Sequence, residues 1–145
     1  MGKELSTKRL ETMMVVAYVF MDRSSCARLR VGCVITNLEM TEIVAYGYNG
    51  NYRGGPNDCD DSEAVGGCGC IHAESNALIK APYRPGELII FITASPCERC
   101  AKKILNAGIH IVVYDEEYRD RTGIQLLKKN GVTVIQIEPP YYPFK

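Results

Sequence analysis

The chain has 145 residues, the size of one ordinary domain, and its 46% hydrophobic and 23% charged content is typical of a folded globular protein. Its 17 basic residues (Lys+Arg) equal its 17 acidic residues (Asp+Glu), so the formal net charge is zero. Because long nucleic acid is held mainly by basic side chains that neutralise phosphates, this balance argues against such a partner and favours a small ligand. We therefore expect one domain over residues 1–145.

An amphipathic helix near residues 6–23 is the first predicted element. Its apolar side chains recur at helical spacing and predict a face that packs on a sheet: Leu10, Met13, Met14, Ala17, Phe20 and Met21. This apolar run is shorter than the roughly 20 residues that cross a bilayer, so no membrane partner is expected. Acidic residues among the preceding lysines argue against an export signal. Seven cysteines without such a signal predict a reducing compartment, the cytoplasm.

Two strands are predicted next, over residues 31–36 and 43–46, and their short connection indicates an antiparallel hairpin. The stretch 47–70 that follows is rich in glycine and has no hydrophobic periodicity. A loop of this length inside a compact domain is usually functional or is held by something other than a core.

From residue 72 onward, helices and strands are predicted to alternate. The segments are helix 72–80, strand 88–93, helix 95–108, strand 109–114, helix 122–130 and strand 132–137. In the second of these helices, Ser95 is the predicted N-cap and Glu98 completes a capping box. Alternation of this kind implies parallel strands with right-handed crossovers, beside the hairpin at one edge. The predicted fold is a three-layer α/β/α sandwich around a five-stranded mixed sheet.

Two short motifs carry the chemistry: His72-Ala73-Glu74 and Pro96-Cys97-x-x-Cys100. One imidazole and two thiolates would supply three ligands to Zn²⁺ and leave a fourth position open, as in catalytic zinc sites. Both motifs fall at predicted helix starts, where the helix dipole favours thiolates. Glu74 is the candidate proton carrier. This combination is the signature of zinc-dependent nucleobase deaminases and predicts hydrolytic deamination with release of ammonia.

Each part of this signature has a simpler interpretation. The Cys97-x-x-Cys100 pair alone could be a redox pair, and Glu74 alone could be a first-turn glutamate that answers the helix dipole. The complete set could also form a zinc scaffold without catalytic activity. The co-occurrence of the motifs at two helix starts favours a metal site, and an intact Glu74 argues against a scaffold, which has no use for the carboxylate.

Longer stretches of the chain resemble the deoxycytidylate (dCMP) deaminases of the cytidine deaminase superfamily. The similar segments are 23–26, 31–35, 47–50, 72–77, 96–104, 107–109 and 114–118. The resemblance implies a cytidine-deaminase-like fold and conversion of dCMP to dUMP for thymidylate synthesis. It also implies a homohexamer that is activated by dCTP and inhibited by dTTP, with Mg²⁺ accompanying a nucleoside triphosphate effector.

The resemblance further implies roles for individual residues. Asn49 would bind the sugar hydroxyl, and the Ala73 amide and Ser95 carbonyl would read the cytosine edge. The residues expected at the phosphate are Arg23, Ser24 and Tyr118. An allosteric nucleotide is expected to bind at a predicted turn formed by Gly47, Tyr48, Asn49 and Gly50, together with Gly54.

Four further cysteines are candidates for a second, structural zinc, because some members of the resembled family carry one. They are Cys26, Cys59, Cys68 and Cys70. No histidine lies in the loop, so the site would be a closed four-thiolate site, which would explain how so glycine-rich a segment is held. The alternative is that these are separate free thiols.

Three other activities remain open at this point. A tRNA-acting adenosine deaminase shares the two motifs, although the zero net charge argues against it. A free cytidine deaminase or a guanine deaminase would differ from a dCMP deaminase only in the contacts made to the phosphate.

Overall fold

The computed structural model describes residues 4–57 and 69–143, and the described part forms four helices and five strands. The helices are α1 (Thr7–Met21), α2 (Ala73–Lys80), α3 (Glu98–Asn106) and α4 (Thr122–Lys129). The strands are β1 (Gly32–Asn37), β2 (Ile43–Tyr48), β3 (Leu88–Ala94), β4 (Ile111–Glu116) and β5 (Thr133–Gln136). None of the helices in the described ranges has the length and apolar character needed to span a membrane.

The strands form one mixed sheet in the order β2-β1-β3-β4-β5. β1 pairs antiparallel with both β2 and β3, whereas β3, β4 and β5 are parallel to one another. The predicted hairpin, parallel half and five-stranded mixed sheet are therefore confirmed. β3 lies at the centre and is buried along its whole length, as expected for a continuous apolar run.

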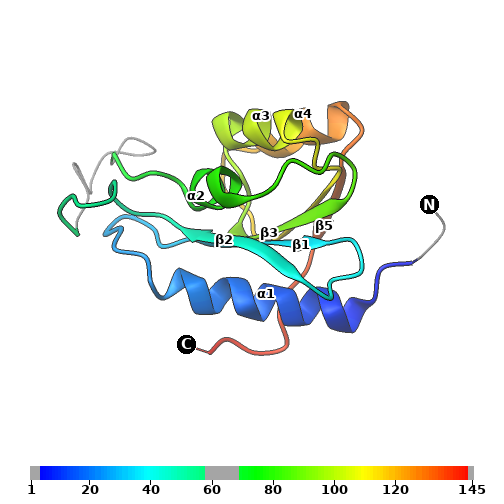
Figure 1. Cartoon of the computed structure of the whole chain (residues 1–145), viewed down its shortest axis with the longest axis horizontal. Coiled ribbons are helices and arrows are strands. Elements are labelled where there is room, and N and C mark those ends of the chain that lie inside the picture. Colours follow the sequence, from blue (N-terminus) through cyan, green and yellow to red (C-terminus); the bar gives the residue numbers. More distant parts are fainter. Residues whose placement is uncertain (1–3, 58–68, 144–145) are drawn as a thin grey trace.

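Helices cover both faces of the sheet, which confirms the three-layer arrangement (Figure 1). On one face α1 packs its apolar side over β1 and β3, around Met14, Val34 and Phe91. On the other face lie α2, α3 and α4, and their core includes Ala77 of α2 and Ile104 of α3. The N-termini of α2 and α3 lie near each other, because the side chains of their N-cap residues, His72 and Cys97, are in contact.

The predicted turn at Gly47-Tyr48-Asn49-Gly50 is wrong, because Gly47 and Tyr48 are the last residues of β2. A Cβ at Gly47 would lie 2.4 Å from the Ala73 carbonyl oxygen and 2.6 Å from the Ala77 nitrogen. Glycine is therefore needed at this position for close packing of β2 against α2, and not for turn geometry. Among the glycines of the predicted effector segment, only Gly54 has a positive φ, of 85°.

The predicted start of α3 is also wrong. The helix begins at Glu98 with Cys97 as its N-cap, two residues later than expected. Ser95 does not cap the helix, because its hydroxyl oxygen accepts a hydrogen bond from the backbone N–H of Tyr118 at 2.8 Å. A hydroxyl directed towards a distant loop is a tertiary contact that local capping rules cannot anticipate.

Candidate metal centre and adjoining pocket

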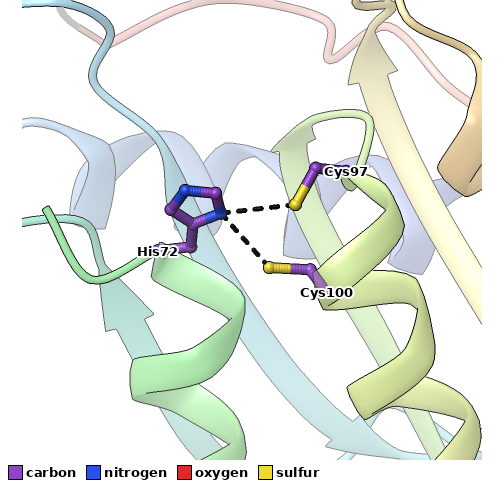
Figure 2. Close-up of side chains that lie close together, drawn as sticks. All are labelled: His72, Cys97 and Cys100. Atoms are coloured by element: carbon purple, nitrogen blue, oxygen red, sulfur yellow. Dashed lines mark hydrogen bonds between the residues drawn. The ribbon is translucent and has the colours of Figure 1, made fainter. Parts of the chain in front are cut away.

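Three donor atoms meet where α2 and α3 begin (Figure 2). The Nδ1 atom of His72 lies 3.5 Å from Cys97 Sγ and 3.3 Å from Cys100 Sγ. His72 and Cys97 are the N-cap residues of the two helices, and neither side chain makes a capping hydrogen bond. Both side chains are therefore directed at each other across the gap between the helices. In the described residues these three form the group suited to a metal, with all donor atoms within 4.8 Å of one another.

Contacts among the three donor groups shift the pKa of each of them. The hydrogen bond from the Cys100 thiol, and after it the contact with His72, lowers the pKa of Cys97 to about 3. The same contact with Cys97 raises the pKa of Cys100. Contact with Cys97 also raises the pKa of His72. Two cysteine sulfurs and one imidazole nitrogen form a donor set that fits Zn²⁺, with three protein ligands.

Glu74 lies in the first turn of α2, two residues after His72, and is only 4% exposed. Burial is the largest effect on its carboxyl group and raises its pKa to about 7. An ordinary first-turn glutamate that answers the helix dipole is solvated, whereas Glu74 lines the internal pocket described below. Its carboxyl group therefore lies where it can contact a molecule bound in the pocket.

Two contacts that sequence reasoning missed hold the helix starts in place. Gly123 in α4 lies against the segment before α3, where a Cβ would sit 2.1 Å from the Pro96 carbonyl oxygen and 2.8 Å from Cys97. Lys103 of α3 donates a hydrogen bond to the hydroxyl of Ser75 in α2 at 2.7 Å. The placement of the metal ligands thus depends on Gly123 in α4 and on the hydrogen bond from Lys103 that joins α3 to α2.

A cavity of about 430 Å³ adjoins the metal centre. Its inner end contains His72, Cys97 and Glu74, and Ala73 and Ser95 line it as predicted for the residues beside the base. The remaining lining residues come from segments far apart in the sequence: Cys26, Arg28, Leu29, Val31, Asn49, Cys70, Ala94, Tyr118 and Asp120. A cavity of this size fits a drug-sized or nucleotide-sized ligand.

Asn49 lines the cavity, but most of its side chain is used to hold the chain together. Its Oδ1 atom accepts from Val31 N at 2.8 Å and from Ser24 Oγ at 2.6 Å, and its Nδ2 atom donates to Leu29 O at 2.6 Å. These bonds leave one amide hydrogen for a ligand. Ser24 itself is 8% exposed and lies behind Asn49, so it supports the pocket wall and does not line the pocket.

The basic side chain that lines the pocket is that of Arg28, and not that of Arg23 as expected from the sequence. Arg23 does not line the cavity, and its guanidinium lies 5.7 Å from the centre of the Tyr48 ring. Arg28 is the one arginine or lysine among the described lining residues. Tyr118 lies on the pocket wall as predicted, and burial raises its pKa to about 12. Asp120 is a second charged lining residue that the sequence did not indicate, and it accepts hydrogen bonds from Thr122 N and Thr122 Oγ1.

The predicted second metal site falls only partly on described residues. Cys59 and Cys68 lie outside them. Cys26 and Cys70 are both buried and pack against each other beside the pocket.

Comparison with known proteins agrees with the zinc site that the geometry indicates. Residues 7–116 match the family described as the cytidine and deoxycytidylate deaminase zinc-binding region. A deoxycytidylate deaminase of Saccharomyces cerevisiae is 37% identical over 135 residues, which cover 85% of this chain and 43% of that protein. The ComE operon protein 2 of Bacillus subtilis is 38% identical over 125 residues, covering 80% and 64%.

Among solved structures, the dCMP deaminase of cyanophage S-TIM5, crystallised with dCMP and dUMP, superposes with a TM-score of 0.81 at 34% identity. The match covers 92% of this chain and 100% of the phage protein. By contrast, this chain spans less than half of the length of the yeast relative and less than two thirds of the Bacillus relative.

Proposed function

The chain belongs to the zinc-dependent cytidine and deoxycytidylate deaminase family, and from this premise we propose that it converts dCMP and water to dUMP and ammonia. The observation that carries the proposal is the composition of one cavity. Two of the three metal donors (His72 and Cys97), a buried carboxylate and an arginine all line the same 430 Å³ space, so one cavity offers groups suited to the base and to the phosphate of a nucleotide. The dUMP so formed would supply thymidylate synthesis.

At the inner end of the pocket, His72, Cys97 and Cys100 would hold zinc, and zinc supplies the Lewis acidity that makes water nucleophilic near neutral pH. Glu74 would take one proton from the attacking water and pass it to the ring nitrogen; it would then take the second proton of that water, from the hydroxyl now bonded to the ring carbon, and give it to the departing amino group, which leaves as ammonia. Because Glu74 is buried, its carboxyl group is largely shielded from bulk solvent. The Ala73 amide and the Ser95 carbonyl orient the cytosine edge.

At the mouth of the pocket, Arg28 replaces Arg23 as the residue proposed to bind the phosphate. A guanidinium can bind a phosphate through two parallel hydrogen bonds, which gives both affinity and orientation. Tyr118 forms the adjoining wall, and Asn49 offers its remaining amide hydrogen to the sugar hydroxyl. Ser24 acts through Asn49, whose side chain it holds.

A spectrophotometric deamination panel tests the substrate. We expect dCMP to be preferred over CMP, dCTP, deoxycytidine, guanine and an RNA stem-loop carrying adenosine. Equal activity on deoxycytidine and dCMP would refute a pocket that reads phosphate and would indicate a free cytidine deaminase. Activity on the stem-loop alone would identify a tRNA adenosine deaminase, and activity on guanine a guanine deaminase. Bound zinc without activity on any of these substrates would indicate a scaffold.

Further properties are proposed from the resemblance to dCMP deaminases. They are one catalytic domain over residues 1–145, a homohexamer in the cytoplasm, activation by dCTP with Mg²⁺ and inhibition by dTTP. The segment assigned to the effector is 47–50 with Gly54, and a second zinc is assigned to Cys26, Cys59, Cys68 and Cys70. Zinc analysis should give two ions per chain, and one would refute the second site. Native mass spectrometry tests the homohexamer, and assays with dCTP and dTTP test the proposed activation and inhibition.

A further inference from the structure

A buried carboxylate outside the pocket joins three separate parts of the chain. Asp115, near the end of β4, is 7% exposed. Its Oδ2 atom accepts a hydrogen bond from the hydroxyl of Tyr18 in α1 and another, at 2.7 Å, from the hydroxyl of Tyr142 near the C-terminus. The two tyrosine rings meet edge to face with their centres 4.7 Å apart. One carboxylate therefore ties together the first helix, the fourth strand and the C-terminal segment 138–143.

The sheet itself does not require a carboxylate at this position. Side chains alternate along a strand, so Ile111, Val113 and Asp115 share the face that packs on α1. Ile111 and Val113 belong to the apolar core on that face, and an apolar residue at 115 would continue the pattern. Burying a carboxylate there is costly unless it is hydrogen-bonded, and one of its two donors is Tyr142 of the C-terminal segment. Figure 1 shows this segment, in red, crossing to the α1 side of the sheet.

The chain that leaves Asp115 enters the pocket within three residues. The carbonyl of Glu116 accepts a hydrogen bond from Ser95 N at 2.8 Å, and the hydroxyl of Ser95 accepts one from Tyr118 N at 2.8 Å. The segment 117–121, here named the pocket loop, contributes Tyr118 and Asp120 to the pocket wall. The position of the pocket loop thus depends on where the end of β4 is held.

We propose that Tyr142 is a positioning residue for substrate binding: by holding Asp115, it fixes the end of β4 and with it the pocket loop. The C-terminal segment 138–143 is here named the clasp, and it is anchored on the face of the sheet opposite the metal centre. The metal ligands lie on α2 and at the start of α3, so the clasp acts on the nucleotide-binding wall and not on the zinc or on Glu74. The effect on substrate rests on the proposed function, whereas the effect on the loop does not.

The test compares Tyr142→Phe with Tyr141→Phe in the full chain. The first variant removes one hydroxyl from the Asp115 cluster, and the second removes one from a neighbouring side chain that is 62% exposed. In Tyr142→Phe we expect KM for dCMP to rise about threefold to tenfold, because one hydrogen bond to a buried carboxylate is lost. Its kcat and zinc content should match those of the parent chain, and Tyr141→Phe should match it in every respect.

Hydrogen exchange followed by mass spectrometry gives a readout that does not depend on activity. Tyr142→Phe should speed exchange in residues 117–121 by about threefold or more and leave α3 unchanged, because only the loop loses its anchor. Unchanged exchange in the pocket loop, or equal acceleration in α3, would overturn the inference. If the parent chain does not deaminate dCMP, the proposed function fails while the exchange result still decides the role of Tyr142.

A double variant separates a role through Asp115 from a general loss of stability. Because Tyr142 acts by holding Asp115, adding Tyr142→Phe to Asp115→Val, which has no acceptor for the hydroxyl, should change loop exchange no further than Asp115→Val alone. Additive effects would overturn the assignment. If Asp115→Val does not fold, the comparison of Tyr142→Phe with Tyr141→Phe decides the matter by itself.

Discussion

The inner end and the mouth of the pocket are built in different ways. The inner end consists of residues at the first turns of α2 and α3, with His72 and Cys97 as N-caps and Glu74 and Cys100 directly after them. The mouth consists of Arg28, Tyr118 and Asp120, which come from two connecting segments separated by about ninety residues. In the proposed function, regular elements would hold the atoms that carry out chemistry, and loops would hold the atoms that select the substrate.

If the two ends have these roles, substitutions can change turnover and substrate selectivity separately in this fold. A helix start is held by the hydrogen bonds of its own turn and by packing against the sheet, so its residues tolerate little movement. Loops over a rigid scaffold are the usual place for binding residues, because they vary without disturbing the core. Substitutions at the two ends should therefore divide into effects on turnover and effects on substrate affinity.

The largest effect is expected at the inner end, from Glu74→Gln. Loss of the proton carrier should lower kcat by about 10²–10⁴-fold, the usual contribution of general acid–base catalysis, while zinc stays bound. Steady-state assays with metal analysis measure both quantities. The matched control is Glu98→Gln, an exposed first-turn glutamate of α3 that should keep full activity. A Glu74 variant with more than about a tenth of the parent rate would contradict the assigned role.

A smaller effect at the same end is expected from Gly123→Ala. The new Cβ would collide with the backbone at Pro96 and Cys97, so the start of α3 must move and zinc affinity should fall by about 10–100-fold, as for other supporting contacts of metal sites. Competition with a chelator measures the affinity. Gln125→Ala, at an exposed position of the same helix, serves as control. Equal zinc affinity in the two variants would show that α4 does not position the ligands.

At the mouth, Arg28→Gln should raise KM for dCMP by about tenfold and leave the kinetics on deoxycytidine unchanged. A hydrogen bond to a charged group is worth about 1.5–3 kcal/mol, and the exposure of Arg28 places its contribution at the lower end. Arg30→Gln is the control, because Arg30 is exposed and its guanidinium lies 3.6 Å from Asp22, away from the pocket. An equal rise in KM for both substrates would exclude phosphate binding by Arg28.

The smallest effect is expected from Asp120→Asn. The asparagine keeps the oxygen that accepts from Thr122 N but removes a negative charge from the pocket wall. Deamination of dCTP relative to dCMP should rise by no more than about fivefold, because interactions of exposed charges are worth up to ~1 kcal/mol. Competition assays with both nucleotides measure the ratio, with the exposed Glu138→Gln as control. A ratio that falls would show that Asp120 does not repel the longer phosphate chain.

Most of the architecture was predictable from hydrophobic periodicity and glycine or proline positions, because these signals are local. The expected order of helices and strands is confirmed, with boundary shifts of up to two residues, as at β4, which begins at Ile111 and not at residue 109. The local signal failed where a side chain is used at long range. Ser95 has the sequence context of an N-cap, yet its hydroxyl is bonded to Tyr118 in another loop.

The sequence by itself determined the chemistry of the metal centre, because His72, Glu74, Cys97 and Cys100 lie in two short motifs whose residue types and spacing suit one metal and one proton carrier. Only the tertiary structure decided which cation reaches the pocket. The resemblance implied Arg23, but the hydrogen bonds of Asn49 hold segment 24–31 so that Arg28 lines the cavity and Arg23 lies over Tyr48. The clasp of Tyr142 on Asp115 is likewise visible only in the fold, because 27 residues separate its partners.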